Sequence, residues 1–273
     1  MARRSPRTSG KAAPPTIPFS AQLGHVARRS MIKTVRQPLV WGPMLVFPLF
    51  FFAITAPGLE GATAIKGFPT DSYISFALSM PFVQAGLSGV QTAGGELAED
   101  IRTGFLSRLS LTPLSGLALV LGTLAGTLLM ALIGGILYVF VGLASGAEIE
   151  AGVGGAAMLV FLSVLYALAF GAVGIFVALR TGSLDSVQAL FPLLFALFFL
   201  SSMAMPRNLI EVGWFKTIAT INPLSYLVEA VRSLLISGWD TEALALGCGI
   251  AIVTTVVALA LAAGQVKQRL VRT

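Results

Sequence analysis

The chain has 273 residues, of which 56% are hydrophobic and only 11% are charged, whereas about 25% of the residues of an ordinary soluble domain are charged. This composition predicts an integral membrane protein and excludes a soluble globular one. The formal net charge of +6 is therefore expected to reflect membrane topology and contact with anionic lipids, and not nucleic-acid binding.

The N-terminal segment divides into a polar arm and an amphipathic stretch. Residues 1–18 are rich in Arg, Pro, Ser and Ala and have no apolar core, so they are predicted to be a disordered basic arm in the cytoplasm. Residues 19–37 place apolar and basic side chains on opposite arcs at helical spacing, which predicts a helix in the membrane interface. A solvated helix packed on a neighbouring domain is the alternative. The polar arc contains Gln22, His25, Arg28, Arg29, Lys33 and Arg36.

Six apolar stretches follow. A helix needs about 20 apolar residues to cross the hydrocarbon, and continuous runs of this length differ from the alternating pattern of barrel strands. We therefore predict an all-α integral membrane fold with one six-helix domain over residues 38–267 and a cytoplasmic tail over 268–273. The predicted spans are about 39–56, 73–92, 114–143, 153–178, 187–205 and 243–263.

The orientation of the spans follows from the distribution of Lys and Arg. Fourteen of the 18 basic residues lie before the first span or after the second, fourth and sixth, and the others are Lys66, Arg207, Lys216 and Arg232. Because short cytoplasmic segments carry the excess of Lys and Arg, we expect a multi-pass protein of the cell (inner or cytoplasmic) membrane with both termini in the cytoplasm.

Ionisable side chains are essentially absent from the predicted spans. Proton relays and ion sites need such residues in the membrane, and a secondary carrier would also show inverted repeats, so these classes are disfavoured. No catalytic pair or metal-ligand cluster can be assembled, and His25 is the only histidine, so we predict neither a catalytic nor a metal site. Candidate substrate-path residues are Gln84, Gln91, Gln188 and the kink-forming Pro192; interhelical hydrogen bonds are the more ordinary role for the glutamines.

The connection between the second and third predicted spans carries many charges. A short helix there would have a polar and an apolar face, and an exposed Phe105 suits insertion into the groove of a partner protein. An interfacial helix bound only to lipid is the alternative. Pro113 would then begin the third span. The candidate docking residues are Glu96, Glu99, Asp100, Arg102, Gly104, Phe105 and Arg108.

A second motif follows the fifth predicted span. Asn222 can cap a helix whose first residue is Pro223, and Glu229 and Arg232 are spaced to pair on one helical face. Tyr226 suits the membrane–water boundary. An ordinary amphipathic external loop is the alternative.

These two motifs carry a family resemblance. The run from Glu99 to Phe105, followed by Leu109 to Leu114 with its Thr-Pro, resembles the coupling-helix signature of the membrane subunits of ABC-2 type ABC exporters. Asn222, Pro223 and Tyr226, with Glu229 and Arg232, resemble the Asn-Pro-x-x-Tyr pattern of the same family, in which two short re-entrant helices dip into the outer leaflet. Among members, the chain looks most similar to the daunorubicin-resistance-type permeases for drugs or lipids.

The resemblance implies a half-transporter. Its partners would be two copies of a separate ABC ATPase subunit, a second permease that is identical or homologous, and membrane lipids. The sequence has no Gly-x-x-x-x-Gly-Lys-Ser/Thr loop, so ATP and Mg²⁺ would bind to the ATPase and this chain would bind no cofactor.

By the same analogy, Glu99, Asp100 and Arg102 would contact an ATPase cleft, with Phe105 as the apolar anchor. The chamber would lie between two permeases, lined by the first, second and fifth spans. Its apolar lining favours export of an amphipathic drug or lipid-like substrate. Export of a lipid-linked cell-surface polysaccharide and a non-transport role in anchoring or assembly are the alternatives.

Overall fold

The computed structural model describes residues 18–109 and 115–271, and within these residues all regular structure is helical. The all-α membrane class is confirmed, because five helical segments are long and apolar enough to cross a membrane. They are Trp41–Gly58, Tyr73–Arg102, Gly116–Ala144, Gly152–Thr181 and Thr241–Val266.

The fifth predicted span corresponds to a shorter helix. Helix α9 (Leu184–Phe199) is apolar but has 16 residues, which at 1.5 Å per residue gives a length of about 24 Å. This is less than the hydrocarbon thickness of about 30 Å. The apolar run predicted over 187–205 is therefore helical only to Phe199, and Pro192 lies inside the helix.

Before α9, the chain forms a series of helices that starts with α1 (Phe19–Val35) and α2 (Pro38–Gly58), followed by the short η1 (Glu60–Ala64). The second span is built from four consecutive pieces: α3 (Tyr73–Ala77), α4 (Ser79–Gly89), the π-helical turn η2 (Val90–Gly94) and α5 (Gly95–Arg102). After these come α6 (Phe105–Leu109), α7 (Gly116–Ala144) and α8 (Gly152–Thr181).

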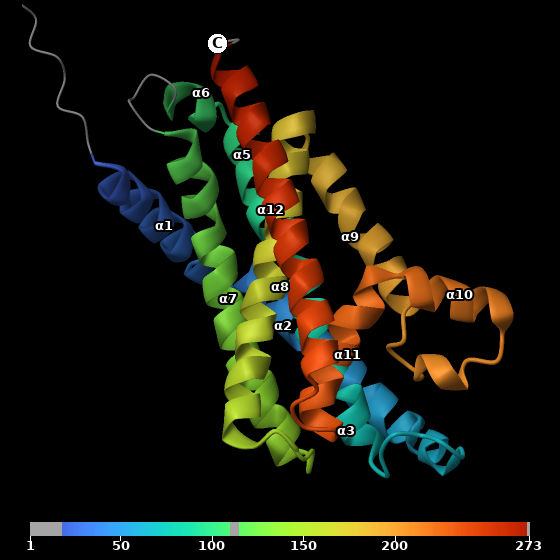
Figure 1. The fold of residues 1–273 in the computed structure, drawn as a ribbon. Helices are drawn as coiled ribbons and strands as arrows, with labels where there is room; N and C mark the ends of the chain where they lie inside the picture. The colour runs from blue at the N-terminus through green and yellow to red at the C-terminus, as the bar shows by residue number, and fades with distance from the viewer. Residues whose placement is uncertain (1–17, 110–114, 272–273) are drawn as a thin grey trace, which may run out of the picture.

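After α9, the chain forms η3 (Arg207–Leu209), α10 (Gly213–Ile221), α11 (Pro223–Ile236) and α12 (Thr241–Val271). Helix α10 projects from the side of the bundle, and α11 runs back beside α12 (Figure 1). The two short helices occupy the region predicted to be re-entrant, and their depth in the outer leaflet stays a prediction. Helix α12 continues to Val271, into the predicted tail.

The core lies around α8, which packs on α4, η2, α7 and α12. Glycines bring the second span against α8: a Cβ added to Gly94 would lie 2.6 Å from the Gly174 carbonyl carbon, and one added to Gly89 would lie 2.7 Å from the Ala167 oxygen. Small residues allow this close approach of helices. The small residues Ala167, Gly171 and Gly174 of α8 therefore allow the second span to pack closely against this helix.

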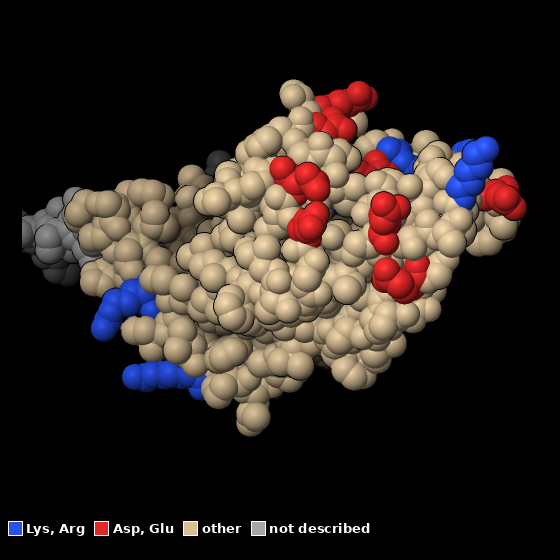
Figure 2. All heavy atoms as spheres, turned by 90° about the horizontal axis from the view of Figure 1, so that it is seen from below, with Lys and Arg blue, Asp and Glu red and all other residues tan. Residues whose placement is uncertain are grey.

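The two ends of the bundle differ in charge. Helix α6 and the C-terminal end of α12 lie at one end, and α3 lies at the other (Figure 1). Figure 2 looks onto the α3 end, across which acidic side chains are spread. The connections there carry Asp71, Glu148, Glu150 and Asp240, and the first turns of η1 and α12 carry Glu60 and Glu242. The excess of Lys and Arg at the opposite end remains the basis of the predicted orientation.

Candidate functional site

Helix α1 is held along α7 by glycine contacts. A Cβ added to Gly122 would lie 2.6 Å from the Val26 Cβ, and one added to Gly126 would lie 2.8 Å from the Ser30 Oγ. Ser30 is fully buried, and its Oγ accepts a hydrogen bond from the Gly126 N–H at 3.2 Å. The helix predicted over residues 19–37 is present as α1 (Phe19–Val35) and uses part of its surface to pack on the bundle; its place in the membrane interface stays a prediction.

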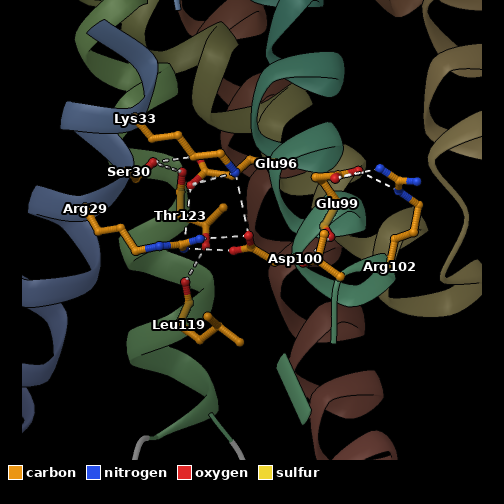
Figure 3. Close-up of polar contacts among 10 residues, drawn as sticks. Arg29, Ser30, Lys33, Glu96, Glu99, Asp100, Arg102, Leu119 and Thr123 are labelled. Atoms are coloured by element: carbon orange, nitrogen blue, oxygen red, sulfur yellow. Dashed lines mark hydrogen bonds and ion pairs between the residues drawn. The ribbon is translucent and has the colours of Figure 1, made fainter. Parts of the chain in front are cut away.

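Four charged side chains join α1 to the end of the second span (Figure 3). The Arg29 guanidinium donates to both oxygens of Asp100, at 2.8 and 2.7 Å. The Lys33 Nζ lies 3.6 Å from the Asp100 Oδ1 and 3.9 Å from the Glu96 Oε1. We call Arg29, Lys33, Glu96 and Asp100 the α1–α5 charge cluster.

The carboxylates of this cluster are buried, whereas its cations are partly exposed. The Glu96 and Asp100 side chains are 8% and 5% exposed, and Arg29 is 34% exposed. The hydrogen bond to Asp100 raises the pKa of Arg29 above its ordinary value. A buried carboxylate that loses its cation keeps its desolvation penalty without compensation, so the cluster couples the position of α5 to that of α1.

The turn η2 sets the direction of α5. A π-helical turn adds one residue to the helix, which rotates all later side chains by about 100° relative to an uninterrupted helix. The backbone of Gly94 lies against Gly174 at this turn. The rotation places Glu96 and Asp100 toward α1. Such turns are frequent at functional sites.

The docking residues predicted from sequence therefore divide into two groups. Glu96 and Asp100 face α1 and are not on the surface. Glu99 and Arg102 are on the outside: the Arg102 Nε and Nη2 each donate to Glu99 at 2.8 Å, and the Arg102 side chain is 68% exposed. Arg108 is also exposed.

The remaining predicted docking residues, Gly104 and Phe105, lie where α5 is connected to α6. Gly104 has a φ of +68°, a left-handed conformation that glycine adopts without strain, and it turns the chain into α6. The Arg29 guanidinium lies 4.1 Å from the centroid of the Phe105 ring. Phe105 thus contacts the charge cluster. The Thr-Pro part of the motif, residues 110–114, lies outside the described residues.

In the second motif, the predicted helix cap is confirmed. The Asn222 Oδ1 accepts from the Leu224 N–H at 3.0 Å and Pro223 begins α11, as predicted for a helix cap. The Tyr226 hydroxyl donates to the Thr220 oxygen at 2.9 Å. Asn222 also donates to the Leu197 oxygen, which ties α11 to α9.

The predicted pairing of Glu229 with Arg232 is wrong. Glu229 pairs with Arg207 instead. Arg232 is buried, and donates to the main-chain oxygens of Ser202 and Met203 at 3.0 and 2.9 Å. The reason is that the chain after α9 leaves carbonyl groups without helical partners, and Arg232 lies on the side of α11 that faces them.

A cavity of about 420 Å³ lies between α1, α2, the η2–α5 segment and α9. It brings together Gln91 and Gln188, two of the predicted path residues. Gln84 is buried in α4 and Pro192 lies further along α9, so neither lines this cavity. Trp41 also lines it; the sequence signal was a tryptophan near the start of a span.

Within residues 18–109 and 115–271, no group of three His, Cys, Asp or Glu side chains is placed to hold a metal ion. A comparison with protein families matches residues 21–236 to the family described as ABC-2 type transporter. A search of curated proteins found no significant match to this chain.

Proposed function

Because the chain belongs to the ABC-2 type transporter family, and so is a transmembrane subunit of an ABC transporter, we propose that it exports an amphipathic drug-like or lipid-like molecule with energy from ATP. ABC-2 permease domains generally work with ABC ATPase partners. In the proposal, two ATPase subunits and two permeases form the transporter. The chain itself is a permease and not a catalytic subunit.

The observation that carries the proposal is the pairing of an exposed charged surface with a buried charge cluster on one helix. Arg102 is exposed and Glu99 is partly exposed on α5, and Asp100 on the same helix is bound to Arg29 of α1. A partner that moves α5 therefore also moves α1 or breaks the buried ion pairs. This gives the chain a mechanical link from its surface to its interior.

The contacts between α5 and α1 lie beside the cavity between α1, α5 and α9. Glu96 belongs to both the charge cluster and the cavity wall. A displacement of α5 relative to α1 would therefore change the shape of the cavity. We propose that ATP-driven motion of the partner alters this cavity and so moves the substrate.

The test is charge reversal at the exposed surface. The chain is co-expressed with an ATPase encoded beside it and purified in lipid nanodiscs. We expect Glu99→Arg to reduce co-purification of the ATPase at least about tenfold, because one misplaced charge pair in an interface costs several kcal/mol. Glu242→Arg, an exposed reversal at the start of α12 on the opposite end, is the matched control and should leave co-purification unchanged.

A complex that forms and hydrolyses ATP equally well with Glu99→Arg would show that α5 is not the docking surface. Failure of the wild-type chain to associate with any ABC ATPase would overturn the transport proposal itself. It would favour an anchoring or assembly role.

A further inference from the structure

Helices α2 and α9 form two walls of the cavity near their starts. Met44 lines it from α2, and Gln188 lines it from α9. Both helices continue past the cavity toward the end of the bundle that carries α3 (Figure 1). The side chains that lie between α2 and α9 in this direction therefore decide whether the cavity is open toward that end.

Beyond the cavity, phenylalanine rings join the two helices. The ring centroids of Phe47 and Phe195 lie 5.8 Å apart, and those of Phe51 and Phe199 lie 5.6 Å apart. On α9, the rings of Phe195 and Phe199 lie 5.0 Å apart and so connect the two pairs. We call Phe47, Phe51, Phe195 and Phe199 the phenylalanine seam. Aromatic pairs at these distances attract each other, and a constriction of apolar side chains can close a path by excluding water.

On each helix, a proline lies where the cavity ends and the seam begins. It follows a cavity residue by four positions and precedes a seam residue by three. These residues are Met44, Pro48 and Phe51 on α2, and Gln188, Pro192 and Phe195 on α9. Because proline has no N–H, the carbonyl group four residues before it loses its helical hydrogen bond, and the helix bends more easily there. Both walls therefore have a point of bending next to the seam.

The two sides of the seam are held with different firmness. The Asn222 Nδ2 donates to the Leu197 oxygen at 2.6 Å, which ties the far half of α9 to α11. Helix α2 packs on α3 and α4, but its outward side is exposed, as at Val46 and Phe50. The α2 side of the seam is therefore the side that moves more easily, with Pro48 as its point of bending.

We propose that the phenylalanine seam is the gate of the transport path. In the arrangement described here, the seam closes the cavity toward the α3 end of the bundle. It opens when α2 and α9 bend at Pro48 and Pro192 and the paired rings separate. The assignment rests on the proposed transport function and names the barrier that its substrate crosses. An amphipathic substrate can replace the lost ring contacts with its own apolar part, whereas an ion cannot.

The α1–α5 charge cluster connects this gate to the proposed docking helix. Helix α2 begins three residues after the end of α1, and Arg29 of α1 is bound to Asp100 of α5. A displacement of α5 that pulls α1 therefore also moves the start of α2, on the cavity side of Pro48. The far end of α9 stays with α11, so the motion separates the two sides of the seam.

The first test measures transfer of a lipid between the two leaflets by the full chain alone. The chain is reconstituted into vesicles that contain fluorescently labelled phosphatidylcholine, and dithionite, which does not cross the bilayer, bleaches the label in the outer leaflet. With the wild type, we expect bleaching of the outer leaflet only. Phe47→Ala and Phe195→Ala remove one ring of a pair and should speed transfer of the inner-leaflet lipid at least about tenfold.

Two further variants control this test. Phe140→Ala is the matched control, because Phe140 is an exposed phenylalanine on α7, outside the seam. Phe195→Leu keeps a large apolar side chain and should transfer lipid as slowly as the wild type. Phe47 is 44% exposed, so its truncation leaves the core intact and the result does not depend on Phe195→Ala alone.

The second test addresses the bending at proline in the complex with the ATPase. Pro48→Ala supplies an N–H for the Met44 carbonyl group and stiffens α2. We expect ATP-driven lipid transfer to slow at least about threefold, while transfer without ATP stays at the wild-type rate. Pro57→Ala is the matched control, because Pro57 lies inside the same helix but beyond the seam.

Transfer at the wild-type rate by both Phe47→Ala and Phe195→Ala, or equally fast transfer by Phe140→Ala, would overturn the assignment of the seam as the barrier. Equal ATP-driven transfer by Pro48→Ala and the wild type would show that the seam does not open by bending at this proline. The first test does not involve the ATPase. If an ATPase associates and the seam variants do not transfer lipid, only the gate is wrong. If they transfer lipid and no ATPase associates, the transport proposal is wrong.

Discussion

The α1–α5 charge cluster and the surroundings of Arg232 hold arginine in two different ways. In the cluster, Arg29 is partly exposed and binds the carboxylate of Asp100, which is 71 residues away in sequence. Arg232 is buried, lies 3.5 Å from the Phe76 ring centroid and donates to main-chain oxygens of Ser202 and Met203. The first contact joins two side chains on separate helices. The second joins a side chain to the backbone after α9.

We call the α1–α5 charge cluster the joint, because its two helices are expected to move relative to each other. We call the surroundings of Arg232 the anchor, because they are expected to hold α11 to the end of α9. In the cluster, the partly exposed Arg29 can find water when the helices move, although the buried Asp100 carboxylate then loses its partner. A buried cation that donates to carbonyl groups cannot leave without breaking their hydrogen bonds, and unsatisfied buried polar groups are costly. We therefore expect α1 and α5 to move relative to each other, while α11 and the end of α9 move as one body.

Substitution of Arg232 should have the largest effect on stability. Arg232→Met leaves the oxygens of Ser202 and Met203 without their donors, and two hydrogen bonds to a charged group are together worth about 3–6 kcal/mol. We expect a lowered thermal unfolding temperature in detergent and reduced yield. Arg207→Met, which removes the partly exposed pair with Glu229 and the contact of the guanidinium with the Tyr226 ring, should cost no more than about 2 kcal/mol. Equal losses from the two variants would show that buried Arg232 contributes no more to stability than a partly exposed arginine does.

The charge cluster should show a smaller stability effect and a larger functional one. Asp100→Asn and Arg29→Met should each cost about 1–3 kcal/mol, because one buried partner is left unpaired. The double variant should cost less than the sum, with an interaction energy of about 1–2 kcal/mol. Denaturation of the wild type, the two single variants and the double variant in detergent measures this interaction energy.

The functional readout for the same variants is ATP hydrolysis by the complex. Asp100→Asn should still co-purify with the ATPase, since Asp100 is buried, but should lose stimulation of hydrolysis by substrate. Normal stimulation in this variant would show that the cluster stabilises the fold without transmitting motion.

How much of the fold and of the candidate site could be predicted from the sequence depends on how far apart in the chain the interacting residues lie. Hydropathy predicts the helices, and the Asn222 cap follows from neighbouring residues. The contact of Arg29 with Asp100 spans 71 residues, and local periodicity carries no information about it. The sequence predicts that Arg232 pairs with the nearest acid, Glu229. It does not show that α9 ends at Phe199 and leaves carbonyl groups that Arg232 can bind.

The turn η2 was also beyond prediction, because a π-helical turn has no distinct composition, although it decides which residues of α5 face α1. Without it, the whole of α5 would be rotated by about 100° about its axis, and Glu96 and Asp100 would point away from α1. The buried half of the docking motif is therefore a consequence of one added residue in the second span.

Gly94→Ala tests this turn and should have a smaller effect on stability than Arg232→Met. The added Cβ would lie within 2.6–2.7 Å of the Gly174 backbone, and such overpacking costs about 1–3 kcal/mol, partly offset by the higher helix propensity of Ala, about 1 kcal/mol. The net loss should be about 1 kcal/mol. Because the two backbones must separate where α5 begins, the charge cluster should shift while the Arg232 anchor remains.

We therefore expect Gly94→Ala to reduce substrate-stimulated ATP hydrolysis as Asp100→Asn does, with only a small change in unfolding temperature. Gly249→Ala on α12, where an added Cβ meets nothing within 4 Å, is the matched control and should be neutral or slightly stabilising. Normal ATP hydrolysis by the complex that contains Gly94→Ala would show that the orientation of α5 at η2 is not required for coupling. The ion pairs between α1 and α5 would then be sufficient to transmit motion.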